Sequence, residues 1–182
     1  MNKKFELLLD DTITIFGVKL FRIKALISFR DVEKGELGGY VEKEDNLGFS
    51  GNAWVSGNAQ VYGDAWVSGN AQVYGDARVY GNAWVSGNAR VYGDAEVYGD
   101  AEVYGNAEVS GDADYIVFKN NWSSGRYFTY TKSNKMWRVG CFYGTGQELI
   151  KKAYQDSEVS GKHYEAYVEF VEKLEKLEET ND

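Results

Sequence analysis

Side chains suited to ligand binding gather in residues 120–146, around a glycine-rich connection. The segment from Gly140 to Gly146 links an expected strand to an expected helix, and backbone N–H groups at a helix start hold phosphate or carboxylate groups. Arginine adds charge pairing with such groups, and aromatic rings add stacking. The candidate ligand-binding residues are Trp122, Arg126, Tyr127, Arg138, Tyr143, Gly144 and Thr145. A capped turn with ordinary hairpin aromatics gives the same pattern, and the lysine of a Walker motif is missing.

The sequence offers no set of catalytic residues. His163 is the only histidine, and imidazole is the usual general base near neutral pH. Cys141 precedes a helix start that would lower its pKa and make it a nucleophile. Its place between Val139 and Phe142 in an expected strand favours a buried structural thiol instead. We therefore predict a protein that is not an enzyme and that uses no cofactor.

Asp76, Asp94 and Asp112 are a weak candidate for a metal site. They are spaced eighteen residues apart, and in a stacked structure they would share one corner, where a cation such as calcium could bind. Solvated aspartates give the same pattern, and we favour that interpretation. Our prediction is that no metal is bound.

These residues flank a six-residue repeat that occurs eleven times without a gap between Gly51 and Ile116. Each copy reads Gly, Asn or Asp, Ala, a variable residue, Val, then Ser or Tyr in most copies. Ala and Val are two residues apart, so on a strand they point to the same side. Gly followed by Asn or Asp forms a corner. Short strands of this kind bury their apolar side by coiling and stacking. Asp45 to Ser50 is a degenerate leading copy, because Leu47 and Phe49 keep the phase.

An aliphatic residue followed by a small residue four positions later, as in Val55 with Ala59, resembles the hexapeptide-repeat left-handed parallel β-helix. The lead-in from Asp31 to Val41 resembles that of bacterial and phage proteins described as acyltransferases. Gly140-Cys141-Phe142-Tyr143-Gly144-Thr145 resembles a phrase in phage and prophage hypothetical proteins. The resemblance implies an all-β solenoid with three hexads per coil. We expect an N-terminal β cap in 1–44, the β-helix in 45–114 and an α+β module in 115–182.

Three hexads per coil place residues eighteen apart above one another. The three expected ladders of outward residues are Trp66, Trp84 and Glu102; Gln60, Arg78, Glu96 and Asp114; and Trp54, Gln72, Arg90 and Glu108. Hexapeptide-repeat relatives are usually trimers, so the resemblance implies a homotrimer. The candidate oligomer interface comprises Trp54, Trp66, Trp84, Tyr62, Tyr80 and Tyr98. Which face forms it stays open.

The two ends depart from the repeat. At the N-terminus we expect a strand in 5–9, a turn at Asp10-Asp11, a strand in 12–16 and another in 18–27. At the C-terminus we expect strands in 115–119, 126–131 and 136–142. Thr145 and Glu148 form a capping box that opens a helix ending near residue 155. A second helix is expected in 162–178.

Charge and composition narrow the classes of partner. The chain of 182 residues has a net charge of −8. The repeats contain nine acidic and two basic residues, so they should repel nucleic acid and not bind it. A single cysteine suits a reducing compartment. No apolar run is long enough to cross a membrane, and the N-terminus lacks a signal-peptide pattern. We expect a cytoplasmic protein, in the host cytoplasm if a phage encodes it.

The leading functional prediction is a non-catalytic, oligomeric binding protein of the phage or prophage type. Its ligand would be a phosphorylated small molecule, such as a signalling nucleotide that it sequesters as a sponge, or a host defence protein. One alternative is an acyl-CoA-dependent acyltransferase with an atypical base, because acyltransferases of the resembled family generally use a histidine near the coils. Another is a structural spacer or an acidic mimic of nucleic acid.

Overall fold

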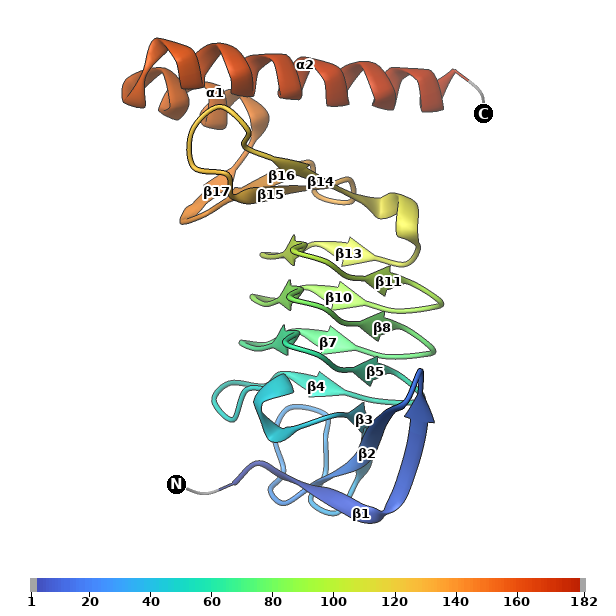
Figure 1. Ribbon diagram of the computed structural model, residues 1–182. Coiled ribbons are helices and arrows are strands. Elements are labelled where there is room, and N and C mark those ends of the chain that lie inside the picture. The colour runs from blue at the N-terminus through green and yellow to red at the C-terminus, as the bar shows by residue number, and fades with distance from the viewer. Residues whose placement is uncertain (1–2, 181–182) are drawn as a thin grey trace.

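The computed structural model describes residues 3–180 and has the shape of a column with a different cap at each end (Figure 1). The N-terminal cap contains β1 (Phe5–Ile15), β2 (Val18–Ala25), β3 (Leu37–Val41) and the short 3₁₀ helix η1 (Glu44–Asn46). The column follows, and a small antiparallel sheet with two helices closes its far end.

The column is built from ten two-residue strands within the described chain. They are β4 (Trp54–Val55), β5 (Gln60–Val61), β6 (Trp66–Val67), β7 (Gln72–Val73), β8 (Arg78–Val79), β9 (Trp84–Val85), β10 (Arg90–Val91), β11 (Glu96–Val97), β12 (Glu102–Val103) and β13 (Glu108–Val109). They form three parallel stacks in the orders β5-β8-β11, β4-β7-β10-β13 and β6-β9-β12. The first stack continues through β3 into the antiparallel strands β2 and β1, so these six strands make one mixed sheet. Trp66 pairs with Trp84, eighteen residues on. The prediction of a β-solenoid with three hexads per coil is confirmed.

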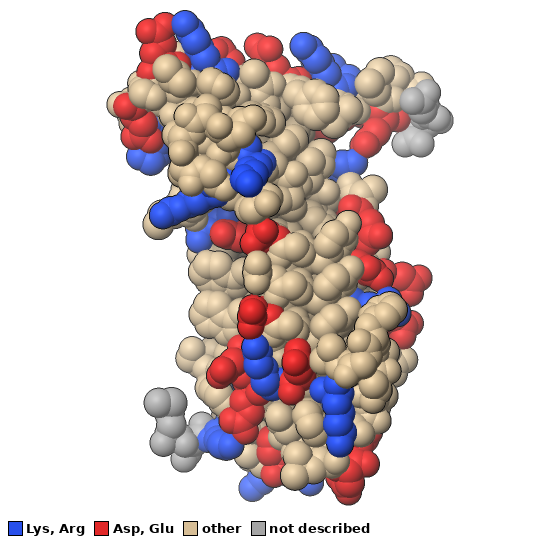
Figure 2. Space-filling model, viewed as in Figure 1, with Lys and Arg blue, Asp and Glu red and all other residues tan. Residues whose placement is uncertain are grey.

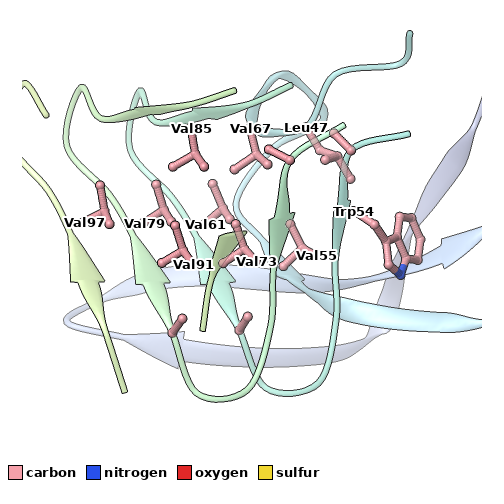
Figure 3. Packing of buried hydrophobic residues seen from close by; sticks show 14 of the residues in the cluster. Leu47, Trp54, Val55, Val61, Val67, Val73, Val79, Val85, Val91 and Val97 are labelled. Carbon is pink, nitrogen blue, oxygen red and sulfur yellow. The ribbon is translucent and has the colours of Figure 1, made fainter. Parts of the chain in front are cut away.

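Ala and Val fill the interior of the coils. Val61, Val79 and Val97 lie in one row, and Leu47 extends the row of Val67 and Val85 (Figure 3). Leu47 pairs with Val67 in a parallel bridge, twenty residues on, whereas the coils pair residues eighteen apart. Leu47 thus takes the place expected for Phe49, and the predicted phase of Asp45–Ser50 as a leading copy is wrong by two residues. Full burial of a valine side chain contributes roughly 1.5 kcal/mol or more, so one valine per hexad gives every coil the same stabilising layer.

Outward side chains stack with the period of the coils. Tyr62, Tyr80 and Tyr98 form a ladder with ring centroids 5.1 and 5.4 Å apart, and Trp66 stacks on Trp84 at 5.3 Å. The indole Nε1 of Trp84 donates to Ser68 Oγ at 3.2 Å. Ser68, two residues after Trp66, thus accepts a hydrogen bond from the tryptophan of the next coil.

Hydrogen bonds between coils follow the parallel-strand pattern and run in both directions. Trp54 N donates to Ala71 O of the next coil, and Ser56 N donates to Val73 O. In the register that pairs Trp54 with Gln72 and Val55 with Val73, the N–H of Val73 lies against the C=O of Trp54 in the previous coil. The first coil is therefore left with groups such as Ala53 O, and the last with groups such as Glu102 N, that no further coil pairs and that need other partners.

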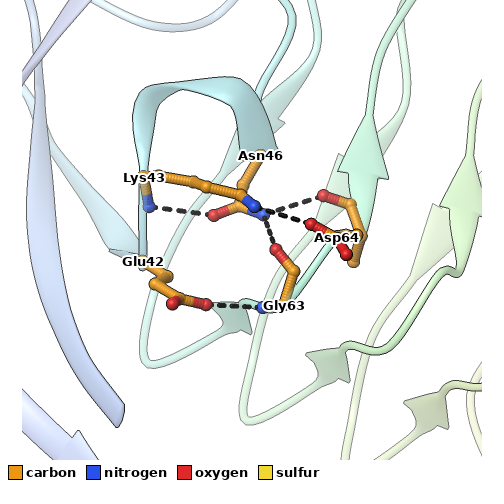
Figure 4. Close-up of polar contacts among 6 residues, drawn as sticks. Glu42, Lys43, Asn46, Gly63 and Asp64 are labelled. Carbon is orange, nitrogen blue, oxygen red and sulfur yellow. Dashed lines mark hydrogen bonds and ion pairs between the residues drawn. The ribbon is translucent and has the colours of Figure 1, made fainter.

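The N-terminal cap supplies donors to the first coil. Tyr40 N donates to Ala59 O, and the side-chain amide of Asn46 donates to Ala65 O at 2.8 Å and to Gly63 O at 3.1 Å (Figure 4). The buried Lys4 amine donates to Ala53 O at 2.8 Å. Burial lowers the pKa of Lys4 to about 8. The expected N-terminal β cap is therefore confirmed, and it also accepts a hydrogen bond from the coil end, because Gly63 N donates to Glu42 Oε2 at 2.7 Å (Figure 4).

One local prediction in this cap is wrong. Asp10 and Asp11 do not turn the chain, because β1 runs on through them with a shift of register between Leu8 and Thr12. The turn instead falls at Phe16 and Gly17, which have φ of 49° and 84°. Hairpin turns favour such positive φ values, and the sequence gives a glycine at only one of the two positions.

Glycine at the corners meets two requirements at once. Gly69 has φ of 65°, and a Cβ there would lie 3.1 Å from the backbone of Gly87 in the next coil. Gly99 has nearly the same φ of 66°, but a Cβ there would meet nothing within 4 Å. Comparing Gly69 with Gly99 therefore separates the energetic cost of a positive φ from the cost of a Cβ that meets the next coil.

We predict that Gly99→Ala lowers the free energy of unfolding by about 1–2 kcal/mol, the usual penalty for a left-handed non-glycine residue. Gly69→Ala should lower it by about 1 kcal/mol more, because overpacking adds to the same strain. Urea unfolding followed by circular dichroism measures both. Equal losses in the two variants would show that the coils yield to the extra methyl group.

Candidate functional site

The C-terminal part covers the end of the column. After η2 (Asp112–Asp114), the strands β14 (Tyr115–Lys119), β15 (Tyr127–Thr131), β16 (Met136–Val139) and β17 (Phe142–Gly144) form one antiparallel sheet. The helices α1 (Gly146–Asp156) and α2 (Glu158–Glu179) lie beyond it, as Figure 1 shows. The prediction of one strand in 136–142 is wrong, because Gly140, with φ of 56°, turns the chain and splits it. Neither helix of residues 3–180 is long and apolar enough to span a membrane.

Side chains of this cap accept the hydrogen bonds that the last coil offers. Glu102 N donates to Thr129 Oγ1 at 2.9 Å and Glu108 N donates to Ser133 Oγ at 2.8 Å. Glu96 N donates to Asp112 Oδ1 at 2.9 Å. On each of the three faces, the backbone N–H of one outward residue of the last coil therefore has a side-chain oxygen as its acceptor.

Two of the candidate ligand-binding residues serve the same junction. Arg138 Nε lies 3.0 Å from Glu102 Oε2, and its guanidinium lies 4.6 Å from the ring centroid of Tyr104. Tyr143 meets Tyr104 edge to face at 5.0 Å. Burial raises the pKa of Tyr143 despite an opposing hydrogen bond from the backbone of Asn106. Both side chains are committed to holding the sheet on the coil.

Trp122 lies on the opposite side of the C-terminal sheet from the coils, packed against the hydrophobic core that the sheet forms with α1 and α2. Its ring stacks on His163 at 4.5 Å and meets Tyr164 edge to face at 4.9 Å. His163 also holds its Nδ1 2.7 Å from Val159 O. The sheet faces the coil with Arg138 and the helices with Trp137, so Trp122 and Arg138 do not share a pocket.

The remaining candidates are divided between other places. Arg126 and Tyr127 border a cavity of about 190 Å³ that Cys141 also lines. Cys141 is exposed, so the prediction of a buried thiol is wrong. Thr145 accepts a hydrogen bond from Glu148 N and begins α1, which confirms the capping box, and Gly144 is buried in β17. The seven candidates therefore do not converge on one site.

The aspartates proposed as a metal site make hydrogen bonds with different partners. Asp76 accepts a hydrogen bond from Asn58 at 3.1 Å, whereas Asp112 belongs to η2 and caps Glu96. Across residues 3–180, no group of three or more His, Cys, Asp or Glu side chains is placed to hold a metal ion. Asp76, Asp94 and Asp112 thus do not form a cation site.

The candidate oligomer interface loses one member. Trp54 is only 4% exposed and meets Phe29 of its own chain edge to face. Trp66 remains 43% exposed and Tyr98 48% exposed. The N-terminal cap therefore covers the first tryptophan. The repeat could not indicate this contact, because Phe29 lies outside it.

A cleft of about 510 Å³ lies where the last coil meets β14, and we call it the junction cleft. Its lining residues are Tyr98, Gly99, Asp100, Asp112, Tyr115, Ile116, Val117 and Tyr127. Tyr98 and Tyr127 are 48% and 42% exposed and offer their rings to solvent. The Tyr115 hydroxyl donates to Glu96 O at 2.9 Å, and burial raises its pKa to about 12. These neutral rings and two carboxylates form the candidate functional site.

The chemistry of the junction cleft suits a cation. Carboxylates pair with ammonium and guanidinium groups, and tyrosine faces attract them. Lys119 already holds its amine 5.4 Å from the Tyr127 ring centroid. In Figure 2, Lys and Arg gather mainly over the two ends of the molecule, and acidic residues follow one edge of the coils.

Sequence reasoning did not find this cleft, because Tyr98 and Tyr127 come from different units. The altered last repeat, Gly111-Asp112-Ala113-Asp114-Tyr115-Ile116, was the available signal. It marks the point where the chain leaves the column, and the cleft forms beside that exit.

Comparison with known proteins supports the repeat architecture. Part of the column matches the family described as YdcK beta solenoid repeat, at residues 59–72, 71–87 and 84–99. No curated protein matches the chain. The fold and this match define a β-solenoid repeat protein, and the match lies within the coils and does not reach either cap.

The capping contact of Thr129 predicts an unusual order of stability. Thr129→Val keeps the buried volume but leaves Glu102 N–H without an acceptor, so the free energy of unfolding should fall by about 1–3 kcal/mol. Thr129→Ser keeps the hydroxyl and should lose only about 1 kcal/mol, for the missing methyl group. Chemical denaturation compares them. If packing alone mattered, the valine variant would equal or exceed the wild type.

Proposed function

We propose that this protein is a non-catalytic binding protein whose junction cleft takes a lysine or arginine side chain of a basic protein partner. The single observation that carries the proposal is the set of lining groups: Asp100 and Asp112 beside the exposed rings of Tyr98 and Tyr127. A cation placed there gains both ion pairing and cation–π attraction.

The charge of the whole chain supports the same class of partner. The net charge of −8 and the acidic coils attract a basic surface over distance and speed its association. A phosphorylated small molecule is the less favoured ligand, because Asp100 and Asp112 repel phosphate. Among the earlier predictions we therefore favour a protein partner, such as a host defence protein bound by a phage- or prophage-encoded chain.

The second candidate function, suggested by the resemblance to hexapeptide-repeat acyltransferases, is acyl transfer, and we consider it separately from the binding role. His163, the only histidine, is stacked on Trp122 in α2 and bonded to Val159 O. The helices lie on the far side of the sheet from the coils (Figure 1). This placement favours the binding role over an acyl transfer that needs a base beside the coils.

A homotrimer remains part of the proposal, with Trp66, Trp84, Tyr62 and Tyr80 as contact residues. Trp54 is excluded because it is buried, and Tyr98 because its ring lines the junction cleft. The exposed ring of Trp66, stacked on Trp84, supplies apolar surface for a neighbouring copy. Native mass spectrometry gives the number of copies directly. A mass of three chains supports the trimer, and a mass of one chain contradicts it.

The cleft is tested with a fluorescent arginine-rich peptide as probe, by anisotropy at fixed salt. Asp100→Asn should raise the Kd about fivefold, which corresponds to ~1 kcal/mol for an exposed ion pair. Tyr127→Leu keeps an apolar side chain but removes the aromatic face, and it should raise the Kd about threefold.

Asp94→Asn is the matched control, because Asp94 is also a corner aspartate but is exposed and does not line the cleft, whereas Asp100 is half-buried in its lining. It should change the Kd less than about twofold, since its charge acts only through screened solvent. Equal losses for Asp94→Asn and Asp100→Asn would contradict a cleft and support the acidic mimic, which binds through overall charge. No binding of the peptide to the wild type would contradict the proposal altogether.

A further inference from the structure

A second cavity, of about 220 Å³, lies on the helix side of the sheet, and we call it the helix cavity. It lies among the start of α1, β16 and α2, and it shares no lining residue with the junction cleft. The lining residues are Tyr130, Lys135, Trp137, Thr145, Gly146, Gln147, Val168, Val171, Glu172 and Glu175. The proposed function makes no use of it.

One side of the helix cavity presents hydrogen-bond donors. Thr145 Oγ1 accepts from Glu148 N, which leaves the N–H groups of Gly146 and Gln147 at the start of α1. The first N–H groups of a helix attract anions, and the helix dipole adds to the attraction. α1 is 11 residues long, enough for this effect.

Trp137 adds an independent donor at the same place. The residue is only 2% exposed and lines the helix cavity. Its Nε1 lies 3.3 Å from the position that a Cβ on Gly146 would occupy, at the start of α1. The fully buried side-chain atoms without a partner in residues 3–180 are Trp54 Nε1 and Gln60 Oε1, and Trp137 Nε1 is not among them. The indole N–H is therefore open to the cavity, where a ligand oxygen would accept its hydrogen bond.

The other side of the helix cavity is acidic and apolar. Glu172 and Glu175 lie three residues apart on α2, one helical turn. Glu175 accepts from the Tyr130 hydroxyl and lies 3.5 Å from the Lys135 amine, whereas Glu172 is exposed. Burial, followed by the contact with Glu175, raises the pKa of Tyr130. Val168 and Val171 provide buried apolar surface between these groups.

We propose that the helix cavity binds a small molecule that carries a carboxylate and an ammonium group on a short apolar body, the class to which free amino acids belong. The carboxylate meets the N–H groups of Gly146 and Gln147 and the Nε1 of Trp137. The ammonium meets Glu172, and the apolar body lies against Val168 and Val171. A phosphate dianion is excluded because two glutamates line the same cavity.

The test titrates three probes of similar shape into the full chain by calorimetry: leucine, 4-methylpentanoate and 3-methylbutylamine. Leucine has both charges, and each of the others has one. Leucine should bind with a Kd of about 1 mM or tighter, and each singly charged probe should bind about tenfold more weakly, because it leaves one set of charged hydrogen bonds unmade.

Two variants and a control assign the contacts. Trp137→Phe keeps an aromatic core residue but removes the N–H, and it should weaken leucine and 4-methylpentanoate about tenfold. Glu172→Gln is at the surface, leaves the core intact, and should weaken leucine and 3-methylbutylamine only. Glu169→Gln changes an exposed charge on α2 that does not line the cavity, and it should change nothing.

Three results would overturn the proposal: no heat of binding with leucine, equal affinity for all three probes, or equal losses in Glu169→Gln and Glu172→Gln. Asp100→Asn should leave leucine binding unchanged. This separates the helix cavity from the junction cleft, so that either one can fail without the other.

Discussion

The structure depends on completing the hydrogen bonds at the two ends of its coils. Each coil pairs with the next through backbone N–H and C=O groups, so the first and the last coil each keep groups that no further coil can pair. These groups cannot be left in a dry contact, because a buried unpaired group costs about 1–3 kcal/mol. At the first coil, Lys4 and Asn46 donate to C=O groups and Glu42 accepts from Gly63 N. At the last coil, Thr129 and Ser133 accept from N–H groups and Tyr115 donates to Glu96 O.

This constraint decides where ligands can bind. One face of the C-terminal sheet is committed to the coil through Arg138 and Tyr143. The other face is covered by the helices, through Trp137 and Phe128. Open surface remains at the borders of the sheet: the junction cleft beside β14, and the helix cavity at the start of α1. The first is acidic and aromatic, whereas the second has donors at one side and acids at the other, so they suit different classes of ligand.

The repeat made the column predictable from sequence, down to which residues stack. Tyr62 over Tyr80 and Arg78 beside Glu96 follow from the period alone, because each coil repeats the geometry of the last. The period says nothing about residues outside it. Alternation in β16 indicates that Trp137 and Arg138 point to opposite faces, but not that a coil end covers Arg138. The ligand pocket expected around Arg138 failed for this reason.

Amide hydrogen exchange, measured residue by residue by NMR, tests the central claim most directly. It compares Glu96, Glu102 and Glu108 in the last coil with Arg78, Trp84 and Arg90, whose N–H groups donate to backbone carbonyls of the following coil. If side chains of the cap satisfy the last coil, the two sets should exchange with protection that agrees within about tenfold. Exchange of Glu96, Glu102 and Glu108 at the rates of an unfolded chain, with the inner amides still protected, would contradict the account.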